Sequence, residues 1–146
     1  MASFALDANC YIRALRDPEE RRQLDAFVDR VLPRVRLHAV VHLELRAGAR
    51  TLAQRAALDR LVGAYAAQES IVTPGPSAFA EAGRVLADLA AKERYADAPP
   101  SFRFDVLLAT SCREAGLTLV TSNHADFARI ARHLRGFRQT PPWPSR

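Results

Sequence analysis

Three carboxylate side chains stand where a folded protein normally places hydrocarbon. Asp7 closes the apolar run at residues 4–6, Glu44 lies within the largely apolar stretch 40–48, and Asp105 opens the apolar stretch 105–112. An ionised carboxylate that is buried without a partner is strongly unfavourable, so such groups are nearly always paired or bound to a metal. Because no Lys or Arg stands at helical spacing to neutralise these acids, we predict that they share one cation.

The spacing around two of these acids supports their placement on packed helix faces. Their neighbours at helical spacing are Val40, Val41, Ala47 and Gly48 for Glu44, and Leu108, Ala109 and Cys112 for Asp105. Purely structural roles are also open. Asp7 could cap the turn that follows it, Asp105 could complement a helix dipole, and Glu44 could have a buried partner.

Regular elements that could position these acids alternate along the chain. The apolar pattern predicts strands at residues 3–8, 35–39, 70–73 and 117–121, with an edge strand at 137–140. It predicts helices from Asp17-Pro18 to Pro33, through Glu44 to Gly48, over 51–68, from Ser77, from Asp105 to Gly116, and after Asn123. The segment 96–101, with its two prolines, is predicted as a loop.

The predicted strands are apolar throughout, which is typical of a parallel sheet covered by helices on both faces. The fold class is therefore α/β, a three-layer α/β/α sandwich around a mostly parallel sheet. Ligands bind at the carboxyl ends of such strands. Asp7 ends the first predicted strand, Glu44 follows the second, and Asn123 follows the strand at 117–121, so acids that are distant in sequence can converge there.

Length and composition restrict the class of protein further. We expect residues 1–146 to form one domain. The chain has no apolar run of membrane-spanning length and no signal-peptide pattern at its start, and its two cysteines, Cys10 and Cys112, lie within predicted elements. We therefore expect a cytoplasmic protein that does not enter the membrane.

The positive charge of the chain has two interpretations. The formal net charge is +5, and Lys92 is the only lysine among 21 basic residues. Arginine matches phosphate oxygens in a bidentate way, which favours an acidic polymer as the partner. However, the arginines are scattered along the chain, as they would be if they only solvated the surface. Charge alone therefore does not establish nucleic-acid binding.

The acid cluster itself favours one chemistry. Oxygen ligands without a Cys or His partner at ligand spacing favour Mg²⁺ or Mn²⁺ over Zn²⁺. Such an ion can activate water and stabilise the charge that develops on a phosphodiester oxygen. On a basic protein, a nucleic acid is the natural substrate for this hydrolysis.

Three sequence motifs carry a family resemblance. They are Leu6-Asp7-Ala8-Asn9, then Glu44-Leu45-Arg46-Ala47-Gly48, and then Phe104-Asp105 through Ala115-Gly116-Leu117-Thr118-Leu119-Val120-Thr121-Ser122-Asn123-His124-Ala125-Asp126-Phe127. In this order they span nearly the whole chain, and the chain resembles PIN-domain ribonucleases, in particular the VapC-type toxins of toxin–antitoxin pairs.

The resemblance implies a Mg²⁺- or Mn²⁺-dependent endoribonuclease that is held inactive by a cognate VapB-like antitoxin and that forms a homodimer. It implies that Asp7, Glu44 and Asp105 bind the metal. The fourth acidic position is either Asn123, where many members of the family carry an acid, or Asp126. Asp126 would then be catalytic with the other three. Asp126 also fits a capping box with Asn123, so a structural role for it stays open.

Two other functions remain possible from the sequence. Because Asn123 stands where many relatives carry an acid, the chain could be a catalytically weak module that binds nucleic acid or antitoxin. The same acids could instead serve a metal-dependent phosphatase. None of the four histidines, His38, His42, His124 and His133, pairs with a cysteine at metal spacing, so we expect them to be ordinary core or surface residues.

Overall fold

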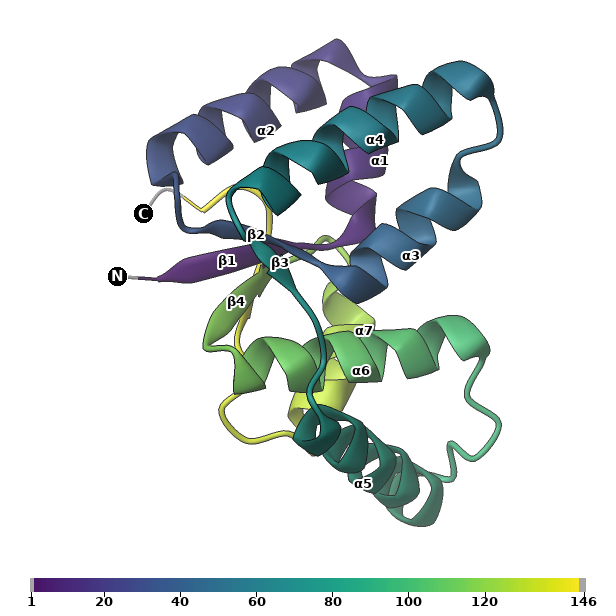
Figure 1. The fold of residues 1–146 in the computed structure, drawn as a ribbon. Coiled ribbons are helices and arrows are strands. Elements are labelled where there is room, and N and C mark those ends of the chain that lie inside the picture. Colours follow the sequence, from purple (N-terminus) through teal and green to yellow (C-terminus); the bar gives the residue numbers. More distant parts are fainter. Residues whose placement is uncertain (1, 145–146) are drawn as a thin grey trace.

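The computed structural model describes residues 2–144, which form five strands and seven helices (Figure 1). The chain order is β1 (Ser3–Leu6), α1 (Ala8–Arg16), α2 (Pro18–Val31), β2 (Val35–His38), α3 (Ala39–Gly48), α4 (Leu52–Ala67), β3 (Ile71–Val72), α5 (Pro76–Glu93), α6 (Pro100–Glu114), β4 (Leu117–Val120), α7 (His124–Ala131) and β5 (Gln139–Thr140).

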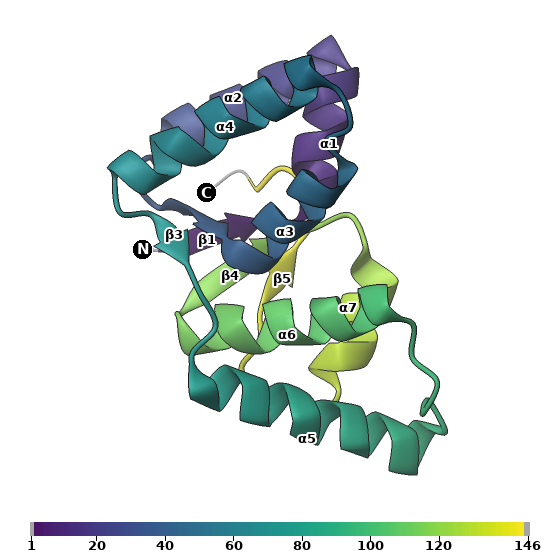
Figure 2. The same cartoon turned by 45° about the vertical axis from the view of Figure 1, so that its right-hand side comes forward.

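All five strands belong to one sheet with the order β3-β2-β1-β4-β5, and every neighbouring pair is parallel. Helices α1, α2 and α4 lie on one side of the sheet and α5, α6 and α7 on the other, so the predicted three-layer α/β/α sandwich is confirmed (Figures 1 and 2). The carboxyl ends of all five strands therefore point to the same edge.

Several helix boundaries follow from local chemistry. Asp17 caps α2 by accepting the Glu19 N–H, as the sequence predicts. Thr51 and Gln54 form a capping box at the start of α4. Gly116, with φ of 70° just beyond the end of α6, adopts a conformation that favours glycine and lets the chain turn into β4.

Several sequence predictions were wrong. The sequence interpretation extended the first strand to Ala8 and placed no helix at residues 8–16, yet β1 ends at Leu6 and α1 begins immediately after Asp7. It also placed Asp105 at the start of its helix and residues 96–101 in a loop, whereas α6 begins at Pro100. Pro at the first helical position explains the earlier start. Asp105 consequently lies in the second turn of α6, so the expected dipole-complementing role in a first turn does not apply.

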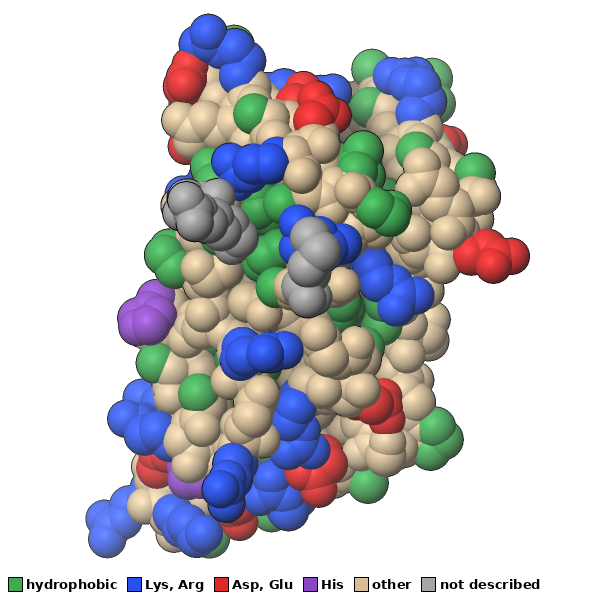
Figure 3. All heavy atoms as spheres, turned by 90° about the vertical axis from the view of Figure 1, so that its left-hand side faces the viewer, with side chains coloured by type: hydrophobic (Ala, Val, Ile, Leu, Met, Phe, Trp, Pro, Cys, Tyr) green, Lys and Arg blue, Asp and Glu red, His purple; other side chains and the backbone are tan. Residues whose placement is uncertain are grey.

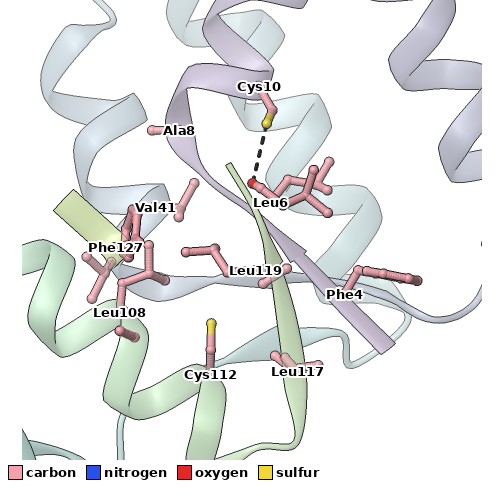
Figure 4. Packing of buried hydrophobic residues seen from close by; sticks show 14 of the residues in the cluster. Phe4, Leu6, Ala8, Cys10, Val41, Leu108, Cys112, Leu117, Leu119 and Phe127 are labelled. Atoms are coloured by element: carbon pink, nitrogen blue, oxygen red, sulfur yellow. Dashed lines mark hydrogen bonds between the residues drawn. The ribbon is translucent and has the colours of Figure 1, made fainter. Parts of the chain in front are cut away.

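The hydrophobic core fills the space between the sheet and both helical layers (Figure 4). Leu117 and Leu119 of β4, Phe127 of α7 and Cys112 of α6 are at most 2% exposed. The Cys10 thiol donates a hydrogen bond of 3.5 Å to the Val120 carbonyl, which joins α1 to the end of β4 (Figure 4). The core therefore holds in place the edge at which β1 and β4 end.

Basic side chains on the face at the amino ends of the strands are dispersed. Figure 3 shows Lys and Arg side chains spread over this face and interrupted by acidic and neutral ones. This face does not gather its positive charge into one block.

Within residues 2–144 no helix has the length and apolar character needed to cross a bilayer.

Candidate active site

The register of the sheet brings the first acid beside a threonine. Leu6 of β1 is paired with Val120 of β4, so the next residues, Asp7 and Thr121, emerge together at the carboxyl edge. The Thr121 hydroxyl donates a hydrogen bond of 2.7 Å to Asp7 Oδ2. Both residues are buried, at 4% and 1% exposure. Asp7 is therefore fixed by the sheet itself.

Asp7 also caps α1, as one interpretation of the sequence allowed. Its Oδ1 accepts the Ala8 N–H at 2.8 Å. Burial raises the pKa of the Asp7 carboxyl, and the hydrogen bonds from Thr121 and Ala8 partly oppose that rise. The cap and a metal-binding role are compatible, because a carboxylate has about four lone-pair sites and the two hydrogen bonds occupy only two.

Glu44 reaches the same edge from α3. The helix begins directly after β2 and is capped by His38, whose Nδ1 accepts the Val40 N–H at 3.1 Å. Glu44 is half-buried on a face that is only partly packed, because Val40 and Val41 are buried whereas Ala47 and Gly48 are exposed. Burial, with a contribution from the charge of Asp7, raises the pKa of Glu44 to about 7.

Asp105 lies on α6 and completes the predicted set. It is half-buried beside the fully buried Leu108, Ala109 and Cys112. Burial, together with the charges of Asp7, Glu44 and Asp126, raises the pKa of Asp105 to about 8. Asp105 therefore lies near enough to the other three acids named from the sequence for their charges to affect its pKa.

The fourth position has a specific local arrangement. Asn123 is the residue before α7, as predicted, but its side chain does not cap the helix. Instead its Nδ2 donates to Asp126 Oδ2 at 3.2 Å, while its backbone N–H donates to Thr121 Oγ1 at 3.0 Å. Thus Asn123 holds one carboxylate oxygen of Asp126, whose charge contributes to the raised pKa of Asp105.

No cation of the described chain neutralises this cluster. Among residues 2–144, the ion pairs involve other acids, and no side-chain hydrogen bond reaches Glu44 or Asp105. The acids that do pair with arginine, such as Glu81 and Glu93, have lowered pKa values instead. The contrast distinguishes the edge cluster, whose acids lack a cationic partner within that range and in which the pKa values of Glu44 and Asp105 are raised, from the paired acids elsewhere.

The donor set fits a hard divalent ion, although the side chains do not form a closed cage. Within the described range 2–144, no three His, Cys, Asp or Glu side chains lie close enough together to hold a metal ion as they stand. Mg²⁺ keeps several waters and needs only one or two protein carboxylates in addition to substrate phosphates. An open arrangement of uncompensated oxygen donors meets that requirement.

The histidines behave as core and surface residues. His38 is fully buried, and its Nε2 lies 2.7 Å from Ser111 Oγ. Burial lowers its pKa to about 4. His133 pairs with Glu93, and His124 is exposed. The sequence interpretation assigned no role to His38 or Ser111, because neither the burial nor the contact between them leaves a local sequence signal.

A family model described as PIN domain matches residues 4–133. No curated protein matches the chain in sequence. The structure of DNA-bound VapBC from Salmonella typhimurium is similar, with a TM-score of 0.72 and 25% identity over 97% of this chain and 98% of that chain.

Two further solved structures share the fold at lower identity. VapBC2 from Rickettsia felis, bound to a promoter DNA fragment, has a TM-score of 0.69 and 18% identity over 97% of this chain and 98% of that one. FitAcB from Neisseria gonorrhoeae has a TM-score of 0.70 and 18% identity over 96% and 98%.

Proposed function

Because the chain belongs to the PIN domain family, we propose that it is a metal-dependent endoribonuclease and the VapC-type toxin of a toxin–antitoxin pair. The observation that carries this proposal is that none of Asp7, Glu44, Asp105 and Asp126 forms an ion pair within residues 2–144, although the charges of the other three acids help to raise the pKa of Asp105. Clustered acids without a cationic partner lower the stability of the folded protein. Groups with such raised pKa values are concentrated at functional sites. Binding of a divalent ion would relieve their repulsion.

The metal would be Mg²⁺ or Mn²⁺, held by Asp7, Glu44 and Asp105, with Asp126 at the fourth position. When bound, the ion supplies Lewis-acid stabilisation of a phosphodiester oxygen and lowers the pKa of an attacking water. The residues of the chain orient these donors. Thr121 fixes Asp7 Oδ2 by its hydroxyl, and Asn123 fixes Asp126 through its amide. Because their pKa values are raised to about 7 and about 8, Glu44 and Asp105 would have to lose their protons to solvent in order to act as ligands.

RNA is the proposed substrate, and cleavage is hydrolysis of a phosphodiester bond. A net charge of +5, which is supplied almost entirely by arginine, favours a polyanion.

A protein antitoxin of the VapB type is the proposed partner. This part of the proposal rests on the structural neighbours, which are VapBC and FitAB-type complexes. We further propose that the chain forms a homodimer and acts in the cytoplasm, where the free thiols of Cys10 and Cys112 are expected to stay reduced.

The test is cleavage of total RNA by the purified protein with Mg²⁺ and with chelator, followed by mapping of the cut ends. Wild type should cut only with the metal, and Asp7→Asn or Asp105→Asn should abolish cleavage. Asp59→Asn, which removes a surface acid paired with Arg46, is the matched control and should cut normally. Equal cleavage by all of these proteins, with or without chelator, would disprove the proposal.

One observation favours a second candidate, a PIN-fold module that binds nucleic acid or antitoxin with little catalysis. The four acids do not form a ready-made metal cage among residues 2–144, and one oxygen of Asp126 is occupied by Asn123. Absence of saturable Mn²⁺ binding would support this module. Turnover of mononucleotides would instead indicate the phosphatase alternative.

A further inference from the structure

A buried hydrogen bond joins the two helices that carry Glu44 and Asp105. His38 is the last residue of β2 and the cap of α3, and Ser111 lies on α6. His38 Nε2 lies 2.7 Å from Ser111 Oγ, and both side chains are 0% exposed. Neither residue is one of the four acids of the proposed site.

The chemistry of the contact has one consistent assignment. His38 Nδ1 accepts the Val40 N–H, so the ring proton of the neutral imidazole resides on Nε2. The ring is therefore a donor to the Ser111 hydroxyl oxygen. The His38 side chain thus accepts a backbone N–H at the start of α3 with one ring nitrogen and donates to Ser111 of α6 with the other.

The position of this bond relative to the acids is symmetrical. His38 precedes Glu44 by six residues, and Ser111 follows Asp105 by six residues. Six helical residues span about 9 Å, so each acid lies less than two turns from the bond along its own helix. Figure 1 shows α3 and α6 running in roughly opposite directions. Because α3 starts at the bond whereas α6 reaches it near its end, the two acids lie in the same direction from it.

In the described part of the chain, side-chain hydrogen bonds between α3 and α6 are scarce. Among the side-chain hydrogen bonds within residues 2–144, the only one that joins α3 or its cap to α6 is the bond between His38 and Ser111. By contrast, the neighbouring Thr110 donates to the Ala78 carbonyl and ties α6 to α5 on the opposite side. The two adjacent hydroxyls of α6 therefore face different partners.

We propose that the bond between His38 and Ser111 sets the separation of Glu44 and Asp105, and that both are positioning residues for the metal site. This inference rests on the proposed function. Outer residues that orient metal ligands typically contribute a factor of about 10 to 100 in affinity or activity. Removing the bond should allow α3 and α6 to shift relative to each other. The carboxylates of Glu44 and Asp105 should then bind one ion more weakly.

The experiment compares two variants that each delete one buried hydroxyl from α6. Ser111→Ala breaks the bond to His38, and Thr110→Val, the matched control, breaks the bond to Ala78. We expect Ser111→Ala to weaken Mn²⁺ binding, measured by calorimetry, about tenfold, and to lower kcat for RNA with KM nearly unchanged. Thr110→Val should lose stability but keep the wild-type Mn²⁺ affinity.

A second pair of measurements separates positioning from stability. His38→Asn keeps a favoured cap for α3 but is too short to reach Ser111, and it should reproduce the Ser111→Ala loss. The double variant should lose no more than either single one, because the two residues form one interaction. If Ser111→Ala and His38→Asn lower only the melting temperature and leave Mn²⁺ affinity and kcat at the Thr110→Val values, the inference is wrong.

A structural readout keeps the inference independent of the proposed function. Nitroxide labels at Leu43→Cys on α3 and Arg103→Cys on α6, both exposed positions, report the distance between the helices by pulsed electron spin resonance. The distribution should broaden or shift with Ser111→Ala and stay unchanged with Thr110→Val. An unchanged distribution would refute the inference. Failure of wild type to bind Mn²⁺ would refute the proposed function. The distance between the labels on α3 and α6 would then decide whether the bond between His38 and Ser111 sets the separation of the two helices.

Discussion

The Thr121 hydroxyl donates to Asp7 Oδ2 across a separation of 114 residues in sequence. The parallel pairing of β1 with β4 creates this contact, because Leu6 and Val120 are aligned and the following residues leave the sheet together. The same hydroxyl oxygen accepts the Asn123 N–H. Thr121 therefore links the first acid to the segment that presents Asp126.

Thr121→Val removes both of these hydrogen bonds at nearly constant volume. The buried Asp7 oxygen loses a donor, so the free energy of unfolding should fall by about 1–3 kcal/mol, and RNA cleavage should fall by at least about tenfold. Urea unfolding and cleavage kinetics measure the two effects. Thr118→Val, on the same strand, is the control. Wild-type cleavage by Thr121→Val would show that Asp7 needs no such support.

The raised pKa values predict how stability depends on pH without metal. In the unfolded chain Glu44 and Asp105 titrate near 4.5 and 3.8, whereas in the folded protein their pKa values are about 7 and about 8. The folded state binds more protons between these limits, so their contribution to the free energy of unfolding falls as pH rises from about 4 to about 8.

The difference between wild type and a variant isolates this contribution from that of His38. The pKa of His38 is lowered to about 4, so its contribution is lost as pH falls and acts in the opposite direction. The variant Glu44→Gln/Asp105→Asn should match wild type near pH 4 and exceed it in stability at pH 8. Denaturation in chelator at several pH values measures the difference in free energy of unfolding between the variant and wild type. A difference that shrinks with rising pH would contradict the assigned pKa values.

Glu114 substitutes for a missing cap on α5. Gly75 stands at the cap position without a side chain, and Glu114 of α6 accepts the Gly75 N–H at 3.2 Å and the Ser77 hydroxyl. Glu114→Ala should lower the melting temperature by a few degrees and leave RNA cleavage per folded molecule unchanged, because the contact lies outside the acid cluster. Asp97→Ala is the control for loss of a surface acid. A proportional loss of kcat would place α5 in the catalytic machinery.

Asp126 provides a test of the fourth position. Its charge contributes to the raised pKa of Asp105, and we therefore propose it as the fourth ligand. Asp126→Asn should weaken Mn²⁺ binding by about tenfold, whereas Asn123→Ala, which removes only the residue orienting it, should have a smaller effect. Calorimetry measures both. A larger effect of Asn123→Ala would assign the fourth position to Asn123.

Local signals predicted most elements of the fold. The pair Asp17-Pro18 marked the start of α2, and the apolar run 117–121 marked β4. Helix α1 was missed because Asp7 both ends β1 and caps α1, which leaves no loop between them. The start of α6 was placed too late because consecutive prolines were interpreted as a loop, although Pro is favoured in a first helical turn.

The acids that we propose for the site were identifiable from the sequence, because a charge within an apolar pattern is easy to recognise. Their supporting residues were not. The bond of Thr121 to Asp7 depends on strand register, and the bond of His38 to Ser111 depends on helix packing. Both are long-range relationships with no local pattern. The sequence also suggested a capping side chain at Asn123, which instead binds Asp126.

Calorimetric titration of Mn²⁺ into wild type, Glu44→Gln, Asp105→Asn and the surface control Asp59→Asn tests most directly whether the acids share one divalent ion. Saturable binding to wild type and to Asp59→Asn, with loss of binding in the other two variants, is the predicted result. Absence of saturable binding to wild type, or equal binding by all four proteins, would contradict the account.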